Sequence, residues 1–238
     1  MIAWLHADTP FPPHEFATIS PNGLLAAGGD LSAERLSEAY RNGIFPWYSD
    51  GDPILWWSPD PRMVLDPAKV RVSRSLAKVL RNRSYEVRFD SAFDQVMAAC
   101  AAPRPGQQGT WITPELQQAY LGLHRLGHAH SIETWIDGEL AGGLYGVALG
   151  AVFFGESMFS QVRDASKIAL VHAARYLQLA GFRIIDCQMH TDHLESMGAI
   201  EMDRDGFLHL LAELVDCRRD AGRWDYSSTR LDVRAVGD

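Results

Sequence analysis

A predicted β-hairpin constrains the fold of this chain more than any other feature. Two runs rich in apolar residues, 129–136 and 139–147, flank the pair Asp137-Gly138. An Asp-Gly pair between two such runs favours a tight turn, because both residues tolerate positive φ. A third apolar run, 149–154, follows closely. Three consecutive strands with short connections pair most simply as an antiparallel meander.

A helix and one more strand follow the predicted meander. Residues 165–180 carry apolar side chains at helical spacing, Gly181 ends the helix, and β-branched residues begin a short strand over 183–187. This order resembles the layout of acyltransferases of the GNAT class, a likeness of fold that does not determine function. We therefore predict an α+β fold with a mixed, mainly antiparallel sheet flanked by helices. Further helices are predicted over residues 73–82, 91–100, 114–126 and 207–218.

The first 62 residues differ from the rest and are predicted to form a small N-terminal domain, followed by a GNAT-like catalytic domain over 63–238. They are rich in Pro, Gly and Trp, with one short helix over 33–41 that Ser32 is placed to cap. The prolines and tryptophans of residues 44–62 are incompatible with a regular helix. They indicate a rigid, aromatic-lined loop whose tryptophans are mostly core, with one or two functional.

Composition indicates an ordinary globular protein of the cytoplasm. The 238 residues are 47% hydrophobic and 22% charged, which suits a sizeable core. No apolar run approaches the roughly 20 residues needed to span a bilayer, and the N-terminus lacks the pattern of a secretory signal. The cysteines, three in number and far apart, argue for reduced thiols and against a disulfide frame or a thiolate zinc site.

One basic segment stands out in a chain whose net charge is −8. Residues 69–88 contain seven basic residues and a single acid, Glu86. Arg74, Lys78 and Arg81 share one face of the predicted helix, and Arg83 follows it. Such a stripe attracts phosphates. The alternative is a helix face that is merely solvated.

An acid and an amide, Asp186 and Gln188, end the predicted strand at 183–187. Alternation along a strand directs both side chains to one face. Burying them at the end of an apolar strand is costly unless they bond each other or a substrate. A structural polar pair at a strand end explains the pattern equally well at this stage.

Glu156 is a second acid in apolar surroundings, between aromatic residues and Met158. Its burial is expensive unless it binds a cation. A substrate ammonium group and Lys167 are both candidate partners. Four apolar residues can line a pocket for an unbranched or aromatic side chain, although such residues in strands are more often core: Leu144, Phe153, Met158 and Ile185.

Other patterns are discounted, and we expect no metal and no cofactor. The histidine pairs at 128/130 and 190/193 lack a convincing third ligand. Cys187 alternates to the face opposite Asp186, which favours a buried structural thiol over thiol catalysis. The pairs Gly28-Gly29 and Gly142-Gly143 are not followed by the Gly-Lys-Ser/Thr pattern of a nucleotide-binding loop, so no ATP chemistry is expected.

Several longer motifs carry a resemblance to a known family. They are Asn22-Gly23-Leu24-Leu25-Ala26, Gly28-Gly29-Asp30-Leu31-Ser32, Gly43-Ile44-Phe45-Pro46-Trp47, Trp56-Trp57-Ser58-Pro59-Asp60-Pro61-Arg62, Gly109-Thr110-Trp111-Ile112-Thr113, Gly155-Glu156-Ser157-Met158-Phe159-Ser160 and Asp186-Cys187-Gln188. The chain closely resembles the leucyl/phenylalanyl-tRNA–protein transferase family over most of residues 11–200. The Trp-Trp-Ser-Pro-Asp-Pro-Arg run is very specific.

The resemblance implies transfer of Leu, Phe or, less well, Met from aminoacyl-tRNA to the N-terminal Arg or Lys of a protein, which marks that protein for N-degron degradation. It also implies that Asp186 and Gln188 are catalytic. Trp47 and Trp111 would stack on the terminal adenosine, with Glu156 near the aminoacyl group. The remaining candidate residues that bind substrate are Leu144, Phe153, Gly155, Met158 and Ile185; those that bind tRNA are Arg74, Lys78, Arg81 and Arg83.

An aminoacyl ester is already activated, so its aminolysis needs neither ATP nor metal. The expected mechanism has Asp186 hold Gln188, so that the pair orients the attacking amine and helps remove its proton. Two other readings stay open. One is an acetyl-CoA-dependent acetyltransferase, although a Gly-rich pyrophosphate loop is not recognisable. The other is a non-catalytic RNA-binding module, for which the Asp186/Gln188 pair would be needless.

Overall fold

The predicted hairpin lies at the centre of the larger of two sheets. The structure, a computed structural model, describes residues 2–103, 110–217 and 221–228. Strand β7 (Ala129–Ile136) pairs antiparallel with β8 (Glu139–Leu149), and both turn residues have positive φ, 54° at Asp137 and 82° at Gly138. Strand β9 (Val152–Ser160) pairs antiparallel with β8. The predicted meander is therefore confirmed.

The strand that follows the meander pairs with it in parallel. Helix α5 (Ala165–Leu179) leads from β9 to β10 (Ile184–Gln188), which lies parallel to β9. The complete order is β11-β5-β10-β9-β8-β7-β6-β12. Its remaining strands are β5 (Arg62–Leu65), β6 (Glu86–Phe89), β11 (Ile200–Met202) and β12 (Ser227–Ser228). Because the other pairings are antiparallel, the predicted mixed, mainly antiparallel sheet and its GNAT-like layout are confirmed.

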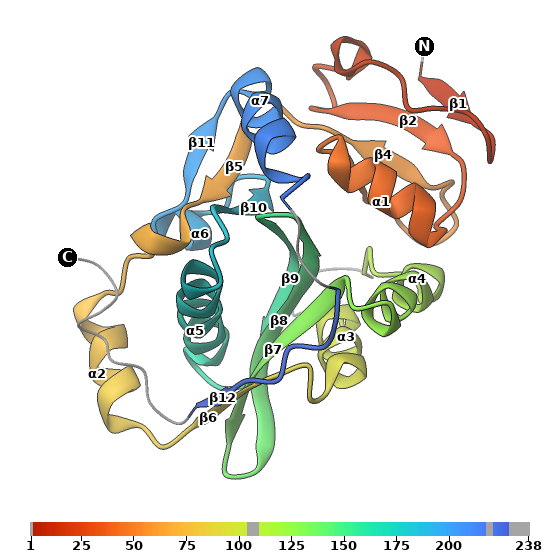
Figure 1. Cartoon of the computed structure of the whole chain (residues 1–238). Coiled ribbons are helices and arrows are strands. Elements are labelled where there is room, and N and C mark those ends of the chain that lie inside the picture. The colour runs from red at the N-terminus through yellow and green to blue at the C-terminus, as the bar shows by residue number, and fades with distance from the viewer. Residues whose placement is uncertain (1, 104–109, 218–220, 229–238) are drawn as a thin grey trace.

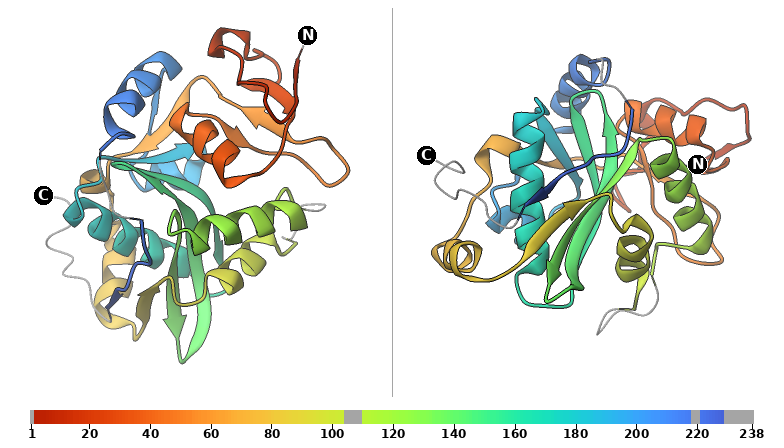
Figure 2. Two further views of the ribbon diagram at one scale, coloured as in Figure 1. Left: turned by 45° about the vertical axis from the view of Figure 1, so that its right-hand side comes forward. Right: turned by 60° about the horizontal axis from the view of Figure 1, so that its bottom comes forward.

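Helices cover both faces of this sheet. Helix α5 lies on one face, and α3 (Phe93–Ala101) and α4 (Pro114–Arg125) lie on the other (Figure 1 and the right view of Figure 2). Close contact of α5 depends on Gly142, where a Cβ atom would lie 2.6 Å from that of Ala165. The remaining α-helices of the described chain are α1 (Ala33–Arg41), α2 (Arg74–Asn82), α6 (Asp192–Ser196) and α7 (Arg204–Leu214).

A smaller sheet, in the order β1-β2-β4-β3, forms the N-terminal unit with α1. Ser32 caps α1 as predicted, accepting the backbone N–H of Arg35. The unit contains β1 (Ala3–Leu5), β2 (Leu24–Gly28), β3 (Phe45–Pro46), β4 (Leu55–Trp57) and a 3₁₀ turn, His14–Phe16; a second 3₁₀ turn, Pro67–Lys69, follows β5.

The predicted loop over residues 44–62 is wrong in part. It contains β3 and β4, and its last residue, Arg62, begins β5 of the large sheet. Trp56 and Trp57 are buried as β4 pairs with β2 and β3, so tertiary pairing decides the backbone here. Trp47, by contrast, is 36% exposed, in agreement with the expectation that most of these tryptophans are core.

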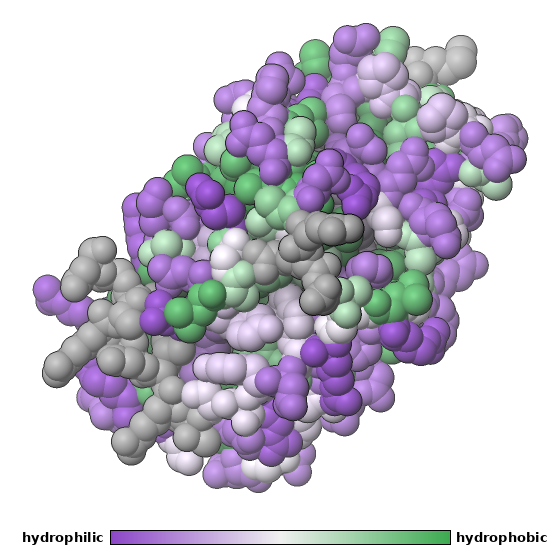
Figure 3. All heavy atoms as spheres, in the orientation of Figure 1, coloured by the Kyte–Doolittle hydropathy of each residue, from purple (hydrophilic) through white to green (hydrophobic). Residues whose placement is uncertain are grey.

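The two sheets share one hydrophobic core. A single cluster contains Leu36 and Trp56 of the small unit together with Phe154 and Phe207 of the large one. Viewed as spheres, the two units form one continuous surface on the face shown, with hydrophilic and hydrophobic residues mixed over it (Figure 3). The domain division at residue 62 therefore stays a prediction.

Two elements, the third strand of the meander and the last helix, differ from their expected bounds by three residues or more. The third strand of the meander begins at Val152 and continues to Ser160, because Gly150, with φ of 54°, makes a turn where the strand was predicted to begin. The last helix ends at Leu214, whereas it was predicted to continue to Arg218, which lies outside the described residues. Gly109, the first residue of the Gly109–Thr113 motif, also lies outside them. None of the helices in the described part of the chain has both the length and the apolar composition needed to cross a bilayer.

Candidate active site

A cavity of about 1080 Å³ lies where three parts of the chain meet. Its wall takes residues from 45–57 in the small unit, from 100–102 at the end of α3, from 110–117 at the start of α4, from the middle of β9, and from the end of β10 and the residues after it. Four predicted site residues line it together: Trp47, Trp111, Glu156 and Gln188. The fold thus brings to one wall side chains that are far apart in the sequence.

Asp186 lies behind this wall, paired with Arg62. The guanidinium donates from Nε to Oδ1 at 2.8 Å and from Nη2 to Oδ2 at 2.7 Å. The two side chains are 1% and 0% exposed, and the guanidinium lies between the rings of Phe45 and Phe207, 4.8 Å from each centroid. Burying two charges is costly, and this bidentate geometry is the kind that compensates for it.

Gln188 leaves the strand at an irregular backbone position. Its φ is +62°, and the pairing of β10 with β5 shifts register between Asp186 and Gln188. The backbone N–H of Gln188 donates to Oδ1 of Asp186 at 2.9 Å, whereas its side-chain Nε2 donates to Oε1 of Glu156 at 2.8 Å. The predicted pair is therefore joined through the Gln188 backbone, and the amide side chain has another partner.

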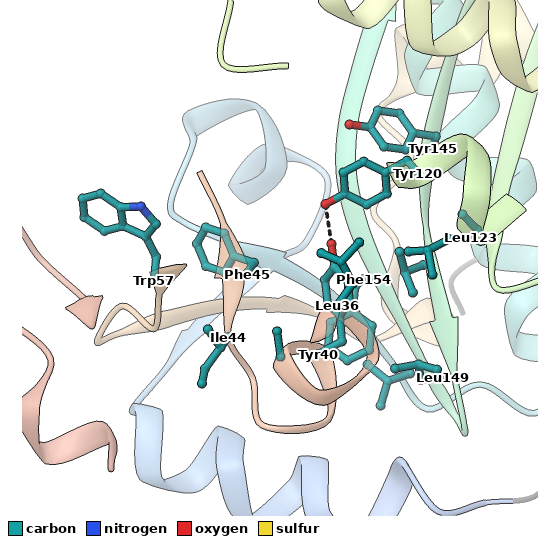
Figure 4. Close-up of a cluster of buried hydrophobic side chains, with 14 of the residues drawn as sticks. Leu36, Tyr40, Ile44, Phe45, Trp57, Tyr120, Leu123, Tyr145, Leu149 and Phe154 are labelled. Carbon is teal, nitrogen blue, oxygen red and sulfur yellow. Dashed lines mark hydrogen bonds between the residues drawn. The ribbon is translucent and has the colours of Figure 1, made fainter. Parts of the chain in front are cut away.

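Glu156 ends a chain of buried hydroxyl groups. Tyr120 donates to Oε2 of Glu156 at 2.7 Å, and the hydroxyl groups of Tyr120 and Tyr40 are 2.5 Å apart. Figure 4 shows Tyr40 from α1 and Tyr120 from α4 pointing toward each other. Since Tyr120 donates to the carboxylate, Tyr40 donates to Tyr120. The chain thus connects the small unit to the cavity wall.

Burial controls the acidity of this cluster. Glu156 is 8% exposed, and desolvation raises its pKa to about 7 against the opposing effect of the Tyr120 hydrogen bond and of the Tyr40 hydroxyl group behind it. The same desolvation, with the Glu156 charge second, raises the pKa values of Tyr40 and Tyr120 well above the ordinary range. Both tyrosines therefore stay protonated donors, while Glu156 can gain or lose a proton near neutral pH.

The prediction that Lys167 could be the cationic partner of Glu156 is wrong. That side chain lies 3.8 Å from Asp164 instead. Glu156 accepts neutral donors from Tyr120 and Gln188, so no cation is required to explain its burial. The error came from counting only charged partners, although neutral hydrogen bonds also stabilise a buried carboxylate.

The five residues predicted to bind the substrate's amino-acid side chain do not lie together in one pocket. Leu144, Phe153 and Ile185 are buried in the core cluster that packs against α5 and line neither of the two cavities described here. Met158 lines a second cavity of about 650 Å³. Gly155 is partly buried, and a Cβ atom there would lie 3.5 Å from the Asp186 carbonyl oxygen. A role for these five residues in a substrate pocket stays a prediction.

The basic helix forms as predicted and exposes its stripe. Ser73 caps α2, and Arg74, Lys78 and Arg81 are exposed. Arg83 lies just past the helix, where it is partly buried and donates to the carbonyl oxygen of Arg163 at 3.2 Å. Figures 1 and 2 place α2 beyond α5, on the opposite side of the sheet from α3 and α4.

The second cavity lies between the main cavity and this basic region. It shares Ala102 with the main cavity, and its wall includes Arg163 and Lys167. Asp164 also lines this cavity, 3.7 Å from Arg163 and 3.8 Å from Lys167. Arg83, just past α2, contacts the carbonyl group of Arg163.

The structure describes the two patterns that the sequence analysis discounted, the Cys187 thiol and the histidines near His190. Cys187 is partly buried and free, and desolvation, with the Asp186 charge second, raises the pKa of its thiol above the usual range. His190, Asp192 and Glu195 have ligand atoms within 4.8 Å of one another. This cluster keeps His190 of the discounted pair and has Asp192 and Glu195 in place of His193. All three residues are exposed, and no metal is assigned to them.

Sequence reasoning missed Arg62, Tyr40 and Tyr120. The spacing of Leu116, Tyr120 and Leu123 marks the apolar face of a helix, so burial of Tyr120 was detectable. Its partner was not, because Glu156 lies on a separate strand. Arg62 follows the Trp-Pro-rich segment, where nothing in the local pattern distinguishes a buried arginine from an exposed one.

Comparisons with known proteins agree with one another at the level of sequence. A family model described as leucyl/phenylalanyl-tRNA protein transferase matches residues 64–212, and one for the N-terminal domain of the same proteins matches residues 29–60. The chain is 62% identical over 226 residues to the leucyl/phenylalanyl-tRNA–protein transferase of Chromobacterium violaceum, covering 95% of this chain and 97% of that protein. It is 61% identical over 229 residues to that of Nitrosomonas eutropha, covering 96% and 98%.

Likeness to solved structures is weaker. A GCN5-related N-acetyltransferase from Kribbella flavida matches with a TM-score of 0.37 and 9% identity, covering 68% of this chain and 58% of that one. An aminoglycoside N-acetyltransferase in complex with CoA matches with a TM-score of 0.34 and 14% identity, covering 59% and 93%. Because these scores are low, the fold description rests on the strand order given above.

Proposed function

The chain belongs to the leucyl/phenylalanyl-tRNA–protein transferase family, and on this premise we propose that it is an aminoacyltransferase acting on aminoacyl-tRNA and protein N-termini. In the proposed reaction, Leu, Phe or, less well, Met passes from its tRNA to the N-terminal Arg or Lys of an acceptor protein. The product carries a new peptide bond and a bulky apolar N-terminus, which would mark it for N-degron degradation.

One observation carries this proposal. Trp47 and Trp111 line the same cavity as Glu156 and Gln188. Aromatic side chains are stacking platforms for unpaired bases, whereas a carboxylate with an amide suits the positioning of an amine and its proton. A cavity with both suits an aminoacylated adenosine, whose base and reactive ester are close together.

In this reaction the protein mainly has to position the amine against the ester carbonyl group. An aminoacyl ester is activated, so aminolysis proceeds downhill without ATP, and orientation of the amine can supply much of the acceleration. The NH₂ group of Gln188 is engaged by Glu156, which leaves the amide oxygen to accept a hydrogen from the incoming amine. Asp186 holds the Gln188 backbone in its irregular conformation.

The acceptor end of the tRNA would extend from the main cavity past the second one toward α2. Arg163 and Lys167 at the second cavity, and the stripe Arg74, Lys78 and Arg81, then meet successive phosphates. Arg83 would contribute less, since its guanidinium already contacts Arg163.

The acceptor protein would enter where acids line the main cavity. Among the described lining residues, Asp50, Asp52 and Glu156 are acidic and none is Lys or Arg. This charge pattern favours an N-terminal Arg or Lys side chain over an acidic one. We also place the reaction in the cytoplasm, because aminoacyl-tRNA is a substrate of protein synthesis there and none of the three cysteines forms a disulfide.

The test uses purified protein with radiolabelled Leu-tRNA or Phe-tRNA and a model protein bearing N-terminal Arg, without ATP or added metal. Label should pass to the acceptor, and changing its N-terminal Arg to Gly should abolish transfer. Transfer that requires ATP, or that ignores the N-terminal residue, would contradict the proposal.

The same assay separates the other classes. Acetylation from acetyl-CoA without transfer from either tRNA would identify an acetyltransferase. Binding of tRNA without any transfer would identify an RNA-binding module.

A further inference from the structure

The proposed reaction leaves one question, namely which group receives the proton that the amine loses. Asp186 is poorly placed for it. It is fully buried, both carboxylate oxygens accept hydrogen bonds from Arg62, and Oδ1 also accepts the Gln188 backbone N–H. It does not line the cavity. A general base must come within hydrogen-bond reach of the proton, directly or through one water.

Glu156 meets the condition that Asp186 does not. It lines the cavity beside Gln188, whose side chain it contacts at 2.8 Å. Each carboxylate oxygen has two lone pairs, and the described donors, Tyr120 and Gln188, use one on each oxygen. The carboxylate therefore keeps acceptor capacity next to the amide that orients the amine.

We propose, resting on the function proposed above, that Glu156 accepts the amine proton and passes it to the departing ribose oxygen, with Tyr120 and Tyr40 as positioning residues. The amine nitrogen bonds to the ester carbonyl carbon while Glu156 takes one N–H proton. The bond between that carbon and the ribose oxygen then breaks, and protonated Glu156 returns the proton to this oxygen. Nothing is oxidised or reduced, and Glu156 ends as a carboxylate.

The surroundings of Glu156 suit a group that both takes and returns a proton. Its pKa is raised to about 7, first by desolvation, and the charge of Asp186 acts in the same direction. The hydrogen bond from Tyr120, the Tyr40 hydroxyl group behind it and the charge of Arg62 oppose this. A base is most effective when its pKa lies near the working pH. Tyr145 also lies near this group: burial raises its pKa, and the Glu156 charge, the second cause, acts in the same direction.

Tyr120 and Tyr40 act on the reaction through Glu156. Tyr120 donates to the charged form, so its hydroxyl group holds the carboxylate in place and lowers its proton affinity. Tyr40 donates to Tyr120 from α1 of the small unit. The N-terminal unit thereby contributes to proton transfer, a role beyond binding of substrate.

The experiment measures single-turnover transfer from Leu-tRNA to an Arg-terminated protein as a function of pH. Below pH 7 the wild-type rate should rise with a log–log slope near 2, because the amine, with a pKa of about 8, and Glu156 must both lose a proton. Glu156→Gln should lower the rate roughly 10²- to 10⁴-fold and leave a slope near 1. A Glu156→Gln rate within a factor of about two of wild type, with the slope unchanged, would overturn the proposal.

Two tyrosine variants form a matched pair. Tyr120→Phe removes a hydrogen bond to the carboxylate. The part of the pH–rate profile that reports deprotonation of Glu156 should therefore move to higher pH by about 1–2 units. Tyr145→Phe removes a hydroxyl group that is equally buried and has no hydrogen-bond partner among the described residues, so that limb should stay in place. Equal profiles for the two variants would also overturn the proposal. Both comparisons assume a wild-type protein that transfers; absence of wild-type transfer would contradict the proposed function instead.

Discussion

Replacement of Arg62 by Met should destabilise the fold strongly, because it leaves the carboxylate of Asp186 buried without its counter-charge. The pair is 1% and 0% exposed, with two hydrogen bonds at 2.8 and 2.7 Å. Breaking a buried pair from one side costs about 3–5 kcal/mol. For a chain of this size, that loss corresponds to roughly 6–20 °C in Tm.

The double variant Arg62→Met/Asp186→Asn separates charge from packing. It removes the buried charge, while an Asn oxygen can still accept the Gln188 backbone N–H. It should therefore recover part of the loss, with a coupling energy between the sites of about 0.5–3 kcal/mol. Urea denaturation followed by circular dichroism measures all four corners of this cycle. A loss below about 1 kcal/mol for Arg62→Met, or a double variant no more stable than Arg62→Met, would refute the reasoning.

Further predictions concern binding and pH. Trp47→Ala or Trp111→Ala should each weaken binding of tRNA about 5- to 150-fold, the loss expected for one stacked base at 1–3 kcal/mol; titration at fixed salt checks it, and unchanged affinity in both variants would exclude stacking. Replacing Arg74, Lys78 and Arg81 with Gln should lower the slope of log affinity against log salt by about 2–3, whereas Arg125→Gln, on exposed α4 surface, should not. Desolvation lowers the pKa of His172 to about 4, so the unfolded chain binds more protons between about pH 6.5 and 4, and stability is lost as pH falls through that range by up to about 1.4 kcal/mol per unit. In His172→Leu, the denaturation midpoint should no longer fall with pH over this range for this reason. In His6→Leu, a variant at an exposed site, the midpoint should fall as in the wild type.

Local sequence patterns were sufficient wherever a segment makes its own contacts. The Asp137-Gly138 turn, the Ser32 and Ser73 caps and the exposed stripe of α2 all depend on residues within a few positions of one another. Such features follow from backbone preference and periodicity, so they were predicted with nearly correct bounds. The small errors, as at Gly150, arise where a turn interrupts an otherwise apolar run.

Predictions failed in part where the backbone or a side chain depends on distant partners. The segment 44–62 contains strands because β2 pairs with β4 and β11 pairs with Arg62. Glu156 does not contact Lys167, and the Gln188 side chain does not bond Asp186, because Tyr120 and Glu156 are the nearer partners. Hydrogen bonds across 32 or 36 residues leave no periodic trace in one sequence.

The sequence by itself determined the family, the central meander and most of the helices, and it singled out four residues that line the cavity, Trp47, Trp111, Glu156 and Gln188, because long motifs and local periodicity carry that information. Only the tertiary structure decided how the site is connected. Arg62 is 124 residues from Asp186, and Tyr40 is 80 residues from Tyr120. The physical reason is desolvation: burial by the whole fold gives a carboxylate a strong need for partners, and the packing of separate strands and helices selects them.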